Sequence, residues 1–388
     1  MKKGTRKAKG SGTIRKRKNG KWEARYTIGR DMKGKQIQRS VYGSTQEEVR
    51  QKLTAIINSI DLNTYIEPSR TTLCDWLRYW LDEYAKDSTK PHTFDHYVAI
   101  CENHIIPEIG SVKLQNVTTS QLQRLYKDLL RKKNLSAKTI RNIHAVIHPA
   151  LQQAVKERIL TSNPAEDCVL PRYVKPKIKP LEDDDVRAFL TEIKGNRFEN
   201  LFYLTLFSGA RQSEVLGLTW DCVNFNDNTI LIDKQLQKIK SSDEKSEYVL
   251  VSTKTDRERV VMLSEYVMQR LEKQKAWQDE CMAKAGSVWN NQLNLVFTNE
   301  LGDHLAHVTV YKSFKAIARK IGLPDARFHD LRHTFAVISF ESGDDVKTVQ
   351  ENMGHSKANT TLDVYTHFSR TMRLRSANNQ QKYIESVI

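Results

Sequence analysis

The sequence predicts a multidomain α+β protein. It comprises a small three-stranded sheet plus one helix, then a four-helix bundle, then a mainly α-helical domain with a small antiparallel sheet. Its 388 residues are enough for two or three domains. Apolar residues alternate with period two near the start and recur at helical spacing from about residue 70. We expect domains at 1–64, 65–168 and 181–370, a linker at 169–180 and a tail at 371–388.

The first module reads as a sheet covered by one helix. Its strands, where apolar or aromatic residues alternate with polar ones, are expected at 13–15, 22–28 and 36–42. The turns between them are expected at Asn19-Gly20 and Lys33-Gly34. Ser44 and Glu47 have the spacing of a capping box and should begin the helix. Its apolar face is Val49, Leu53, Ile56, Ile57 and Ile60.

Most of the excess positive charge lies in this module. The chain has 62 Lys and Arg against 46 Asp and Glu, a formal charge of +16, and residues 1–43 alone carry +13 of it. Such a local excess favours a polyanionic partner, although a charged run can also be an ordinary solvated face. The residues expected to contact nucleic acid here are Arg15, Lys16, Arg17, Lys18, Lys21, Trp22, Arg25 and Tyr26.

Four amphipathic stripes predict a helical bundle in the second module. They run through residues 73–81, 94–101, 122–130 and 140–155. The stretch 171–180 then contains three prolines and four basic residues without a helical period, which is typical of a semi-extended linker. Because its charge is all positive, Lys175, Lys177 and Lys179 are expected to lie along a nucleic-acid backbone.

Several protein classes are excluded. The N-terminus lacks the apolar region of a secretory signal, and no apolar run approaches the length of a membrane span. The five cysteines form no CxxC pair, which suits a reducing cytoplasm. Neither a phosphate-binding loop for ATP nor a metal-ligand cluster is present in the sequence, so no cofactor is expected.

The last module combines helices with strands expected at 229–232, 248–251 and 259–263, and it concentrates residues suited to phosphoryl transfer. Arg211 follows a Gly-containing turn at the start of an expected helix, where a guanidinium and a helix N-terminus can bind an anion. His329 and Arg332 are three residues apart and share a helix face. His355 precedes Thr360, Thr361 and Tyr365.

In this order the motifs resemble those of the tyrosine site-specific recombinases, or phage-type integrases. The upstream modules are similar to the arm-binding and core-binding domains of integrases from conjugative transposons and temperate phages. The resemblance implies that Tyr365 is the nucleophile and that Arg211 and Arg332 neutralise charge on the attacked phosphate. It also implies that His329 assists proton transfer and that His355 donates a hydrogen bond to a phosphate oxygen.

The resemblance further implies a lysine, carried on the turn of a strand pair, that protonates the departing 5′ oxygen. The string from Ser252 to Leu263 matches that hairpin and selects Lys254. Other lysines compete for the role, namely Lys238, Lys240 and Lys245. The polar segment 238–247 is expected to be either a DNA-facing loop or a solvated insertion.

As a member of this family the protein would cleave and rejoin DNA through a covalent 3′-phosphotyrosine, without ATP or hydrolysis. It would integrate and excise a mobile genetic element through a Holliday junction, as a homotetramer on double-stranded DNA. An excisionase and a host DNA-bending protein are further partners that the resemblance suggests. The expected location is the bacterial cytoplasm, at the nucleoid when the enzyme acts.

Three alternatives use the same residues differently. His329 and His333, with Asp330 beside the first, superficially resemble a metalloprotease helix. A DNA-binding repressor with a degenerate recombinase fold would not need the full set of polar residues. A topoisomerase with the same chemistry would not need two upstream DNA-binding modules. The tail 371–388 is expected to dock either on a neighbouring protomer, where it would gate Tyr365, or on its own chain.

Overall fold

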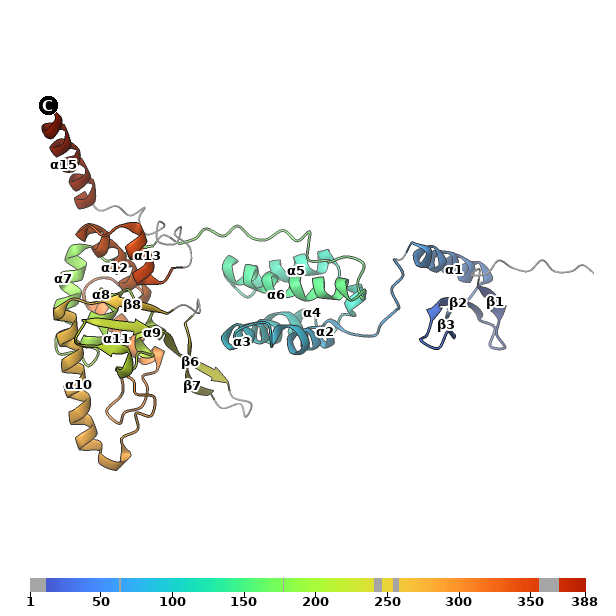
Figure 1. Ribbon diagram of the computed structural model, residues 1–388. Helices are drawn as coiled ribbons and strands as arrows, with labels where there is room; N and C mark the ends of the chain where they lie inside the picture. Colours follow the sequence, from blue (N-terminus) through green and yellow to red (C-terminus); the bar gives the residue numbers. More distant parts are fainter. Residues whose placement is uncertain (1–11, 63, 177, 241–245, 254–257, 356–369) are drawn as a thin grey trace, which may run out of the picture. The chain divides into compact units, whose positions relative to one another are not determined.

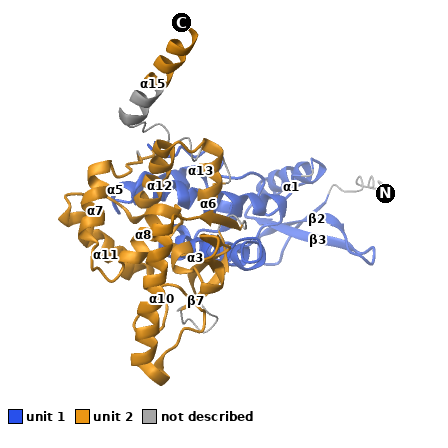
Figure 2. Cartoon of the chain, turned by 60° about the vertical axis from the view of Figure 1, so that its left-hand side comes forward, with its two compact units in different colours: residues 1–174 blue, residues 175–388 orange. Residues whose placement is uncertain are grey.

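The computed structural model describes residues 12–388 except 63, 177, 241–245, 254–257 and 356–369 (Figure 1). It divides into two compact units, residues 1–174 and 175–388, which Figure 2 colours separately. The chain is mostly helical with small antiparallel sheets, so the predicted α+β class is confirmed. The finer division into domains stays a prediction.

The N-terminal module is the expected sheet and helix. Strands β1 (Thr13–Lys16), β2 (Trp22–Arg30) and β3 (Gln36–Gly43) form an antiparallel sheet in the order β1-β2-β3. Helix α1 (Gln46–Asp61) covers one face of the sheet, where its Val49 and Leu53 are buried with Ala24 and Tyr26. This small apolar cluster holds the module together.

The predicted capping box at Ser44 and Glu47 is wrong by one residue. Thr45 is the N-cap, because it has the extended backbone that an N-cap needs, and its hydroxyl accepts a hydrogen bond from the backbone nitrogen of Glu48 at 3.1 Å. The Glu48 carboxylate in turn accepts from the backbone nitrogen of Ser44 at 2.8 Å. Both halves of the box exist, one position later.

The second module contains the four expected helical segments around one buried core. Each of the first two continues into a π-helical turn, and a short helical turn separates the second segment from the third. A long-range hydrogen bond from the indole nitrogen of Trp76 to the carbonyl of Ala150, at 2.9 Å, ties the first segment to the last. The elements are α2 (Leu73–Trp80), η1 (Leu81–Ala85), α3 (Pro91–Ile100), η2 (Cys101–Ile105), α4 (Ile106–Ile109), η3 (Leu114–Asn116), α5 (Thr119–Arg131) and α6 (Ala137–Lys156).

Helix α8 lies in the core of the second unit, and its residues 201–206 are all buried. Phe189, Phe202, Phe314 and Phe328 form an aromatic cluster in this core. Among the residues that the structure describes, no helix is long and apolar enough to cross a bilayer. The helices are α7 (Asp183–Glu192), α8 (Glu199–Ser208), α9 (Gln212–Leu216), α10 (Glu265–Ala285), α11 (His307–Lys320), α12 (Phe328–Ser342), α13 (Val346–Met353) and α15 (Arg370–Val387), with short turns η4 (Trp220–Cys222) and η5 (Gly286–Val288).

The three predicted strands of this unit are present but belong to two sheets. Strands β5 (Thr229–Ile232) and β8 (Arg259–Met262) pair with each other and with the short β4 (Val223–Asn224). Strand β7 (Ser246–Ser252) pairs instead with β6 (Lys234–Lys240), which the sequence analysis did not predict.

The β6–β7 pairing also revises the predicted loop at 238–247. Lys238, Ile239 and Lys240 continue β6 and pair with the start of β7, so both ends of this polar segment are paired strands. Inter-strand backbone hydrogen bonds stabilise the extension in spite of its polar side chains. Residues 241–245 lie outside the described residues.

Candidate active site and nucleic-acid interface

Arg211 lies where the sequence predicts it, at the N-terminus of a helix. Helix α8 ends at Gly209, which has a left-handed backbone (φ 64°), and Arg211 is the N-cap of α9. Its backbone nitrogen donates to one oxygen of Glu214 at 2.9 Å, and its Nη1 donates to the other at 2.5 Å. The Glu214 side chain is fully buried, whereas that of Arg211 is 19% exposed. The buried carboxylate therefore fixes the guanidinium of Arg211, part of which stays accessible to a ligand.

Arg332 is held by the ends of two other helices. It sits in α12 and is 1% exposed. Its Nη1 donates to the carbonyl of Gly209 and its Nη2 to the carbonyl of Met353, both at 2.5 Å. Those carbonyls terminate α8 and α13, so the negative ends of two helices face this cation. Within the described residues its Nε is buried and has no hydrogen-bond partner.

His355 follows directly after α13. Gly354 caps that helix with a left-handed backbone, and the backbone nitrogen of His355 donates to the carbonyl of Gln350 at 3.1 Å. The side-chain amide of Gln350 donates back to the carbonyl of His355 at 3.0 Å. The position of the histidine backbone is therefore set by the end of α13.

Sequence reasoning missed Arg259, which links the separate parts of this site. Its Nη2 donates to Glu214 at 2.6 Å and its Nε to the carbonyl of Asn352 at 2.7 Å. A Cβ on Gly354 would lie 3.0 Å from the Arg259 guanidinium, so this close packing favours a glycine. One residue of β8 thereby fixes both the carboxylate beneath Arg211 and the helix that ends before His355. The only signal in the sequence was its place in the hairpin string that selects Lys254.

His329 and His333 occupy successive turns of α12, and their rings meet edge to face with centroids 4.8 Å apart. The start of the helix is fixed by Arg327 and Asp330, which form a reciprocal cap. His333 is thus a ring partner inside the helix. In the described part of the chain, no group of three or more His, Cys, Asp or Glu could hold a metal ion.

The charges of the site perturb one another strongly. Burial, and then the charges of Arg332 and Arg211, lower the pKa of His329 to about 4 and that of His355 to about 3. Burial, followed by the charge of Arg211, lowers the pKa of Arg332. Burial alone would raise the pKa of Glu214, but the hydrogen bond and charge of Arg259 and the charge of Arg211 bring it to about 2. Buried positive charge is concentrated here, which favours binding of an anion.

Four of the six predicted catalytic residues are thus described, on α12 and next to the ends of α8 and α13. The other two, Lys254 and Tyr365, lie outside the described residues. Of the lysines that compete with Lys254, Lys238 is on β6, Lys240 ends that strand, and Lys245 also lies outside the described residues.

The predicted DNA-contacting residues of the N-terminal module divide into packed aromatic side chains and exposed basic ones. Tyr26 is buried and Trp22 is partly buried, and both pack in the cluster beneath α1. The structure therefore gives the two aromatic side chains a packing role. The remaining residues of the prediction are exposed, namely Arg15, Lys16, Arg17, Lys18, Lys21 and Arg25.

In the linker, Lys175 and Lys179 are exposed, and Lys177 lies outside the described residues.

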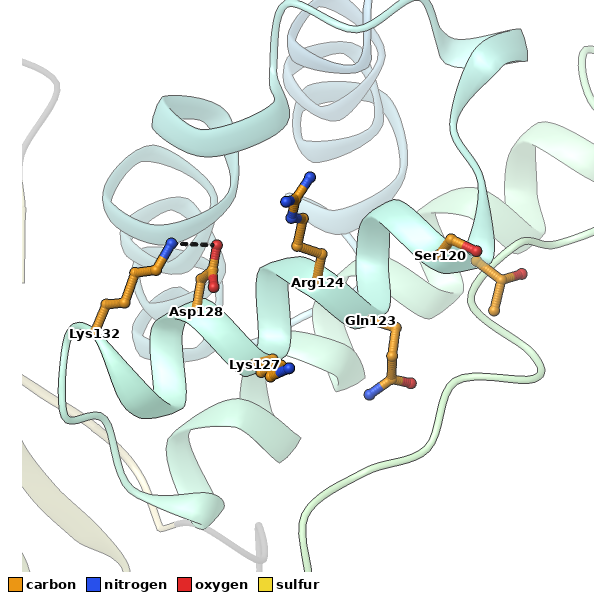
Figure 3. Close-up of a pocket in the computed structure, with 7 residues that line it drawn as sticks. Ser120, Gln123, Arg124, Lys127, Asp128 and Lys132 are labelled. Carbon is orange, nitrogen blue, oxygen red and sulfur yellow. Dashed lines mark hydrogen bonds and ion pairs between the residues drawn. The ribbon is translucent and has the colours of Figure 1, made fainter.

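A polar hollow of about 620 Å³ lies along α5 in the helical module (Figure 3). Lys132 and Asp128 form an ion pair of 3.0 Å at one end of it. Arg124 and Lys127, which the sequence analysis did not select, extend from the same helix. They lie on the polar side of the stripe that predicted the helix, and that is the signal that could have found them. The full lining is Thr119, Ser120, Gln123, Arg124, Lys127, Asp128 and Lys132.

Comparison with known proteins gives matches along most of the chain. Residues 179–372 match the Phage integrase family, and residues 72–130 match the Phage integrase, N-terminal SAM-like domain. A XerC-like tyrosine recombinase of Caldanaerobacter subterraneus subsp. tengcongensis is 32% identical over 366 residues, which cover 90% of this chain and 93% of the relative. The ICEBs1 integrase of Bacillus subtilis is 22% identical, covering 92% and 95% of the two chains.

Solved structures share the fold at lower sequence identity. The Tn1549 transposon integrase in complex with a circular intermediate DNA has a TM-score of 0.64 and 22% identity, and covers 80% of this chain and 99% of that one. A lambda integrase dimer bound to a COC' core site has a TM-score of 0.55 and 16% identity, with coverage of 92% and 96%. At these identities the likeness concerns the architecture.

Proposed function

We propose a phosphate-binding site for this chain, which belongs to the phage integrase family and is a tyrosine recombinase that cleaves and rejoins DNA at specific sites. The residues proposed to bind the phosphate of the strand being cut are Arg211, His329, Arg332 and His355. The observation that carries this proposal is that hydrogen bonds fix both guanidiniums, while His329 lies one turn before Arg332 on α12 and His355 directly follows α13. Planar guanidiniums donate to phosphate oxygens in pairs and stabilise charge that develops on them.

The chemical step assigned to this site is a transesterification. The hydroxyl oxygen of Tyr365 attacks phosphorus, the bond from phosphorus to the 5′ oxygen breaks, and a 3′-phosphotyrosine forms. The tyrosine proton is transferred away with the help of His329, and Lys254 protonates the leaving 5′ oxygen. Attack by the 5′ hydroxyl of another strand reverses the sequence and rejoins the DNA. The phosphodiester energy is conserved, so no ATP is consumed.

The two arginines differ in the N–H groups that they retain for substrate. Arg211 uses Nη1 for Glu214, and among the described contacts its Nε and Nη2 are not engaged. Arg332 uses both terminal nitrogens for carbonyls, and its Nε is left without a partner. A buried donor without a partner costs about 1–3 kcal/mol, which a phosphate oxygen in hydrogen-bonding distance would offset.

The two histidines act in their neutral form. With their pKa values lowered to about 4 and about 3, His329 and His355 are uncharged at pH 7 in the free protein. A neutral imidazole donates one hydrogen bond and accepts one. His329 can therefore accept a proton during the attack, and His355 can donate to a non-bridging oxygen.

The deciding experiment uses a duplex from an element end that carries a nick near the crossover, so that cleavage traps the enzyme. The expected product is a covalent protein–DNA adduct that forms in EDTA. Tyr365→Phe should abolish the adduct and leave DNA binding intact, measured by mobility shift. Failure of the wild-type protein to form any adduct on such a duplex would favour a DNA-binding protein without catalysis. Loss of cleavage in EDTA that zinc restores would favour a metal-dependent mechanism.

The wider assignment is integration and excision of a mobile genetic element by a DNA-bound tetramer. It is supported by the similar proteins: one is the ICEBs1 integrase, another is the Tn1549 transposon integrase, and a lambda integrase tetramer is known bound to a Holliday junction. An excisionase and a host DNA-bending protein are proposed partners. The proposed place of action is the bacterial nucleoid. Cleavage mapping on both ends of a candidate element tests the assignment.

The proposed DNA-contacting surfaces are the exposed basic residues of the sheet, the linker lysines and the hollow on α5. In that hollow Arg124 and Lys127 supply the cations. Each contact to a phosphate contributes about one unit to the salt dependence of binding. Arg124→Ala and Lys127→Ala should each lower that slope by about one, and an unchanged slope would place the DNA elsewhere.

A further inference from the structure

The open face of the N-terminal sheet is built around one carboxylate. Along β2, Trp22, Ala24 and Tyr26 face the helix, so Glu23 and Arg25 face the opposite way. Cross-strand pairing places Arg15 of β1 and Tyr42 of β3 directly beside Glu23 and places Ser40 beside Arg25. Glu23 therefore stands in the middle strand of this face with polar neighbours on both sides.

Glu23 is buried by those neighbours even though α1 covers the opposite face of the sheet. Its side chain is 1% exposed, whereas Arg15, Arg17 and Arg25 around it are 53%, 44% and 45% exposed. One carboxylate oxygen accepts from the Nε of Arg15 at 2.8 Å and of Arg17 at 3.1 Å. The other accepts from Ser40 at 2.9 Å and from the Nε of Arg25 at 3.4 Å.

The arrangement orders three cations that would otherwise repel one another. Arg17 is further restrained by the ring of Tyr42, whose centroid is 5.3 Å from the guanidinium carbon. Burial would raise the pKa of Glu23, but hydrogen bonds from Arg15, Ser40 and Arg25 bring it to about 2, so the carboxylate is charged at neutral pH.

Two of the three arginines keep both terminal nitrogens for recognition while they are anchored, whereas Arg15 also uses its Nη2 for Glu23 at 2.8 Å. In the described contacts Arg17 and Arg25 use only Nε toward Glu23, which leaves both terminal nitrogens of each unengaged. A guanidinium whose side chain is already ordered loses less entropy when it binds. Two parallel N–H groups match the O6 and N7 edge of guanine in the major groove, which gives sequence selectivity that phosphate contacts do not.

We propose that Glu23 is a positioning residue: it holds Arg15 beside it and orients Arg17 and Arg25 so that their terminal nitrogens can read base edges of a DNA duplex. The inference rests on the proposed function, in which the basic sheet binds DNA. Charge complementarity selects a duplex as the occupant, since residues 1–43 carry a net charge of +13. Glu23 acts through the arginines, because it is too buried to reach a base itself.

The test uses the full-length protein and a pool of random DNA duplexes. Selection with the wild type should enrich a sequence element whose enrichment disappears when Arg15, Arg17 and Arg25 are all replaced by Ala. Selectivity is then the ratio of affinities for a duplex with this element and for its shuffled version. Glu23→Gln should lower that ratio about tenfold, the effect of losing one bidentate base contact.

Two further variants separate positioning from charge and from folding. Glu47→Gln makes the same change of charge on the exposed side of α1 and should keep the wild-type ratio. Arg17→Lys keeps the charge at a half-exposed position but removes the planar fork, so it should lower the ratio even if Glu23→Gln fails to fold. Affinity for the shuffled duplex should rise equally in the two glutamine variants.

The outcomes distinguish this inference from the function on which it rests. If the triple alanine variant binds every duplex as the wild type does, with the same salt slope, the sheet is not a DNA surface and both ideas fail. If that variant loses affinity but Glu23→Gln, folded, keeps its selectivity, the sheet binds DNA and the positioning role is wrong. Wild-type selectivity in Arg17→Lys would also overturn it.

Discussion

Replacing Gly209 by Ala tests whether the end of α8 fixes Arg332, the proposed catalytic arginine of α12. Gly209 has a left-handed backbone with φ 64°, and a Cβ there would lie 2.4 Å from Cδ1 of Phe335. Phe335 is three residues beyond Arg332 on the same helix, and the Gly209 carbonyl is one of the two that hold Arg332. The added methyl group should therefore displace Phe335 and, through α12, Arg332.

The expected loss of stability has two parts. An L-residue in the left-handed region costs about 1–2 kcal/mol, and overpacking against a buried ring costs about 1–3 kcal/mol more. Gly195 is a matched control, since it also has a positive φ, 73°, but open space around its missing Cβ. Gly195→Ala should lose only the stability that the left-handed backbone costs, about 1–2 kcal/mol. In urea unfolding, the free energy of unfolding of Gly209→Ala should be about 1–3 kcal/mol lower than that of Gly195→Ala.

The rate of covalent adduct formation by Gly209→Ala should fall by more than its loss of stability alone would cause. A displacement of about 1 Å at a catalytic group can lower a rate about 100-fold. Gly209→Ala should therefore form the covalent adduct on a nicked duplex about 100-fold more slowly under conditions where it is still folded, and Gly195→Ala at the wild-type rate. Adding Phe335→Leu should recover part of both losses by making room for the methyl group. Equal stability and equal adduct rates in the two alanine variants would refute the reasoning.

Three other outcomes are expected. Glu214→Gln should slow adduct formation at least about tenfold with unchanged DNA binding in a mobility shift, because Arg211 and Arg259 lose their shared counter-charge. For His333, burial lowers the pKa from 6.5 to about 4, so the unfolded chain takes up its proton first as pH falls. Unfolding free energy of the ligand-free protein should then decrease from pH 6.5 toward pH 4, and a flat urea-unfolding profile would contradict it. Deleting 371–388 should impair assembly on DNA, because Tyr383 and other apolar side chains of the tail are exposed; unchanged assembly and cleavage would rule out docking on a neighbour.

Sequence periodicity predicted where helices and strands form, but it did not predict which strands pair with each other. Alternation predicted β7 from Tyr248 to Val251, but nothing local showed that β6 would be its partner, because β6 alternates polar with apolar residues only weakly. The capping signals at the start of α1 were correct in kind and one position early. Local patterns define a helix or a strand, and which strand it pairs with depends on contacts distant in sequence.

The motifs located the candidate site, but not the structure that supports it. Arg211, His329, Arg332 and His355 were predicted from residue types and order, and each is placed beside a helix end or within α12. Arg259 was not predicted, since its role depends on Glu214 and Asn352, which are 45 and 93 positions away along the chain. Hydrogen bonds between residues so far apart produce no periodic pattern in the sequence from which they could be predicted.

The sequence by itself determined the fold class, the family and the partner, because helical and strand periods, the ordered polar motifs and a +13 charge in residues 1–43 are all local properties of the chain. Only the tertiary structure decided which face of the basic sheet is open. Burial of Trp22 and Tyr26 under α1 turned Glu23 and its arginines outward. The physical reason is that alternation gives each strand two faces, and the packing of α1 decides which of them is covered.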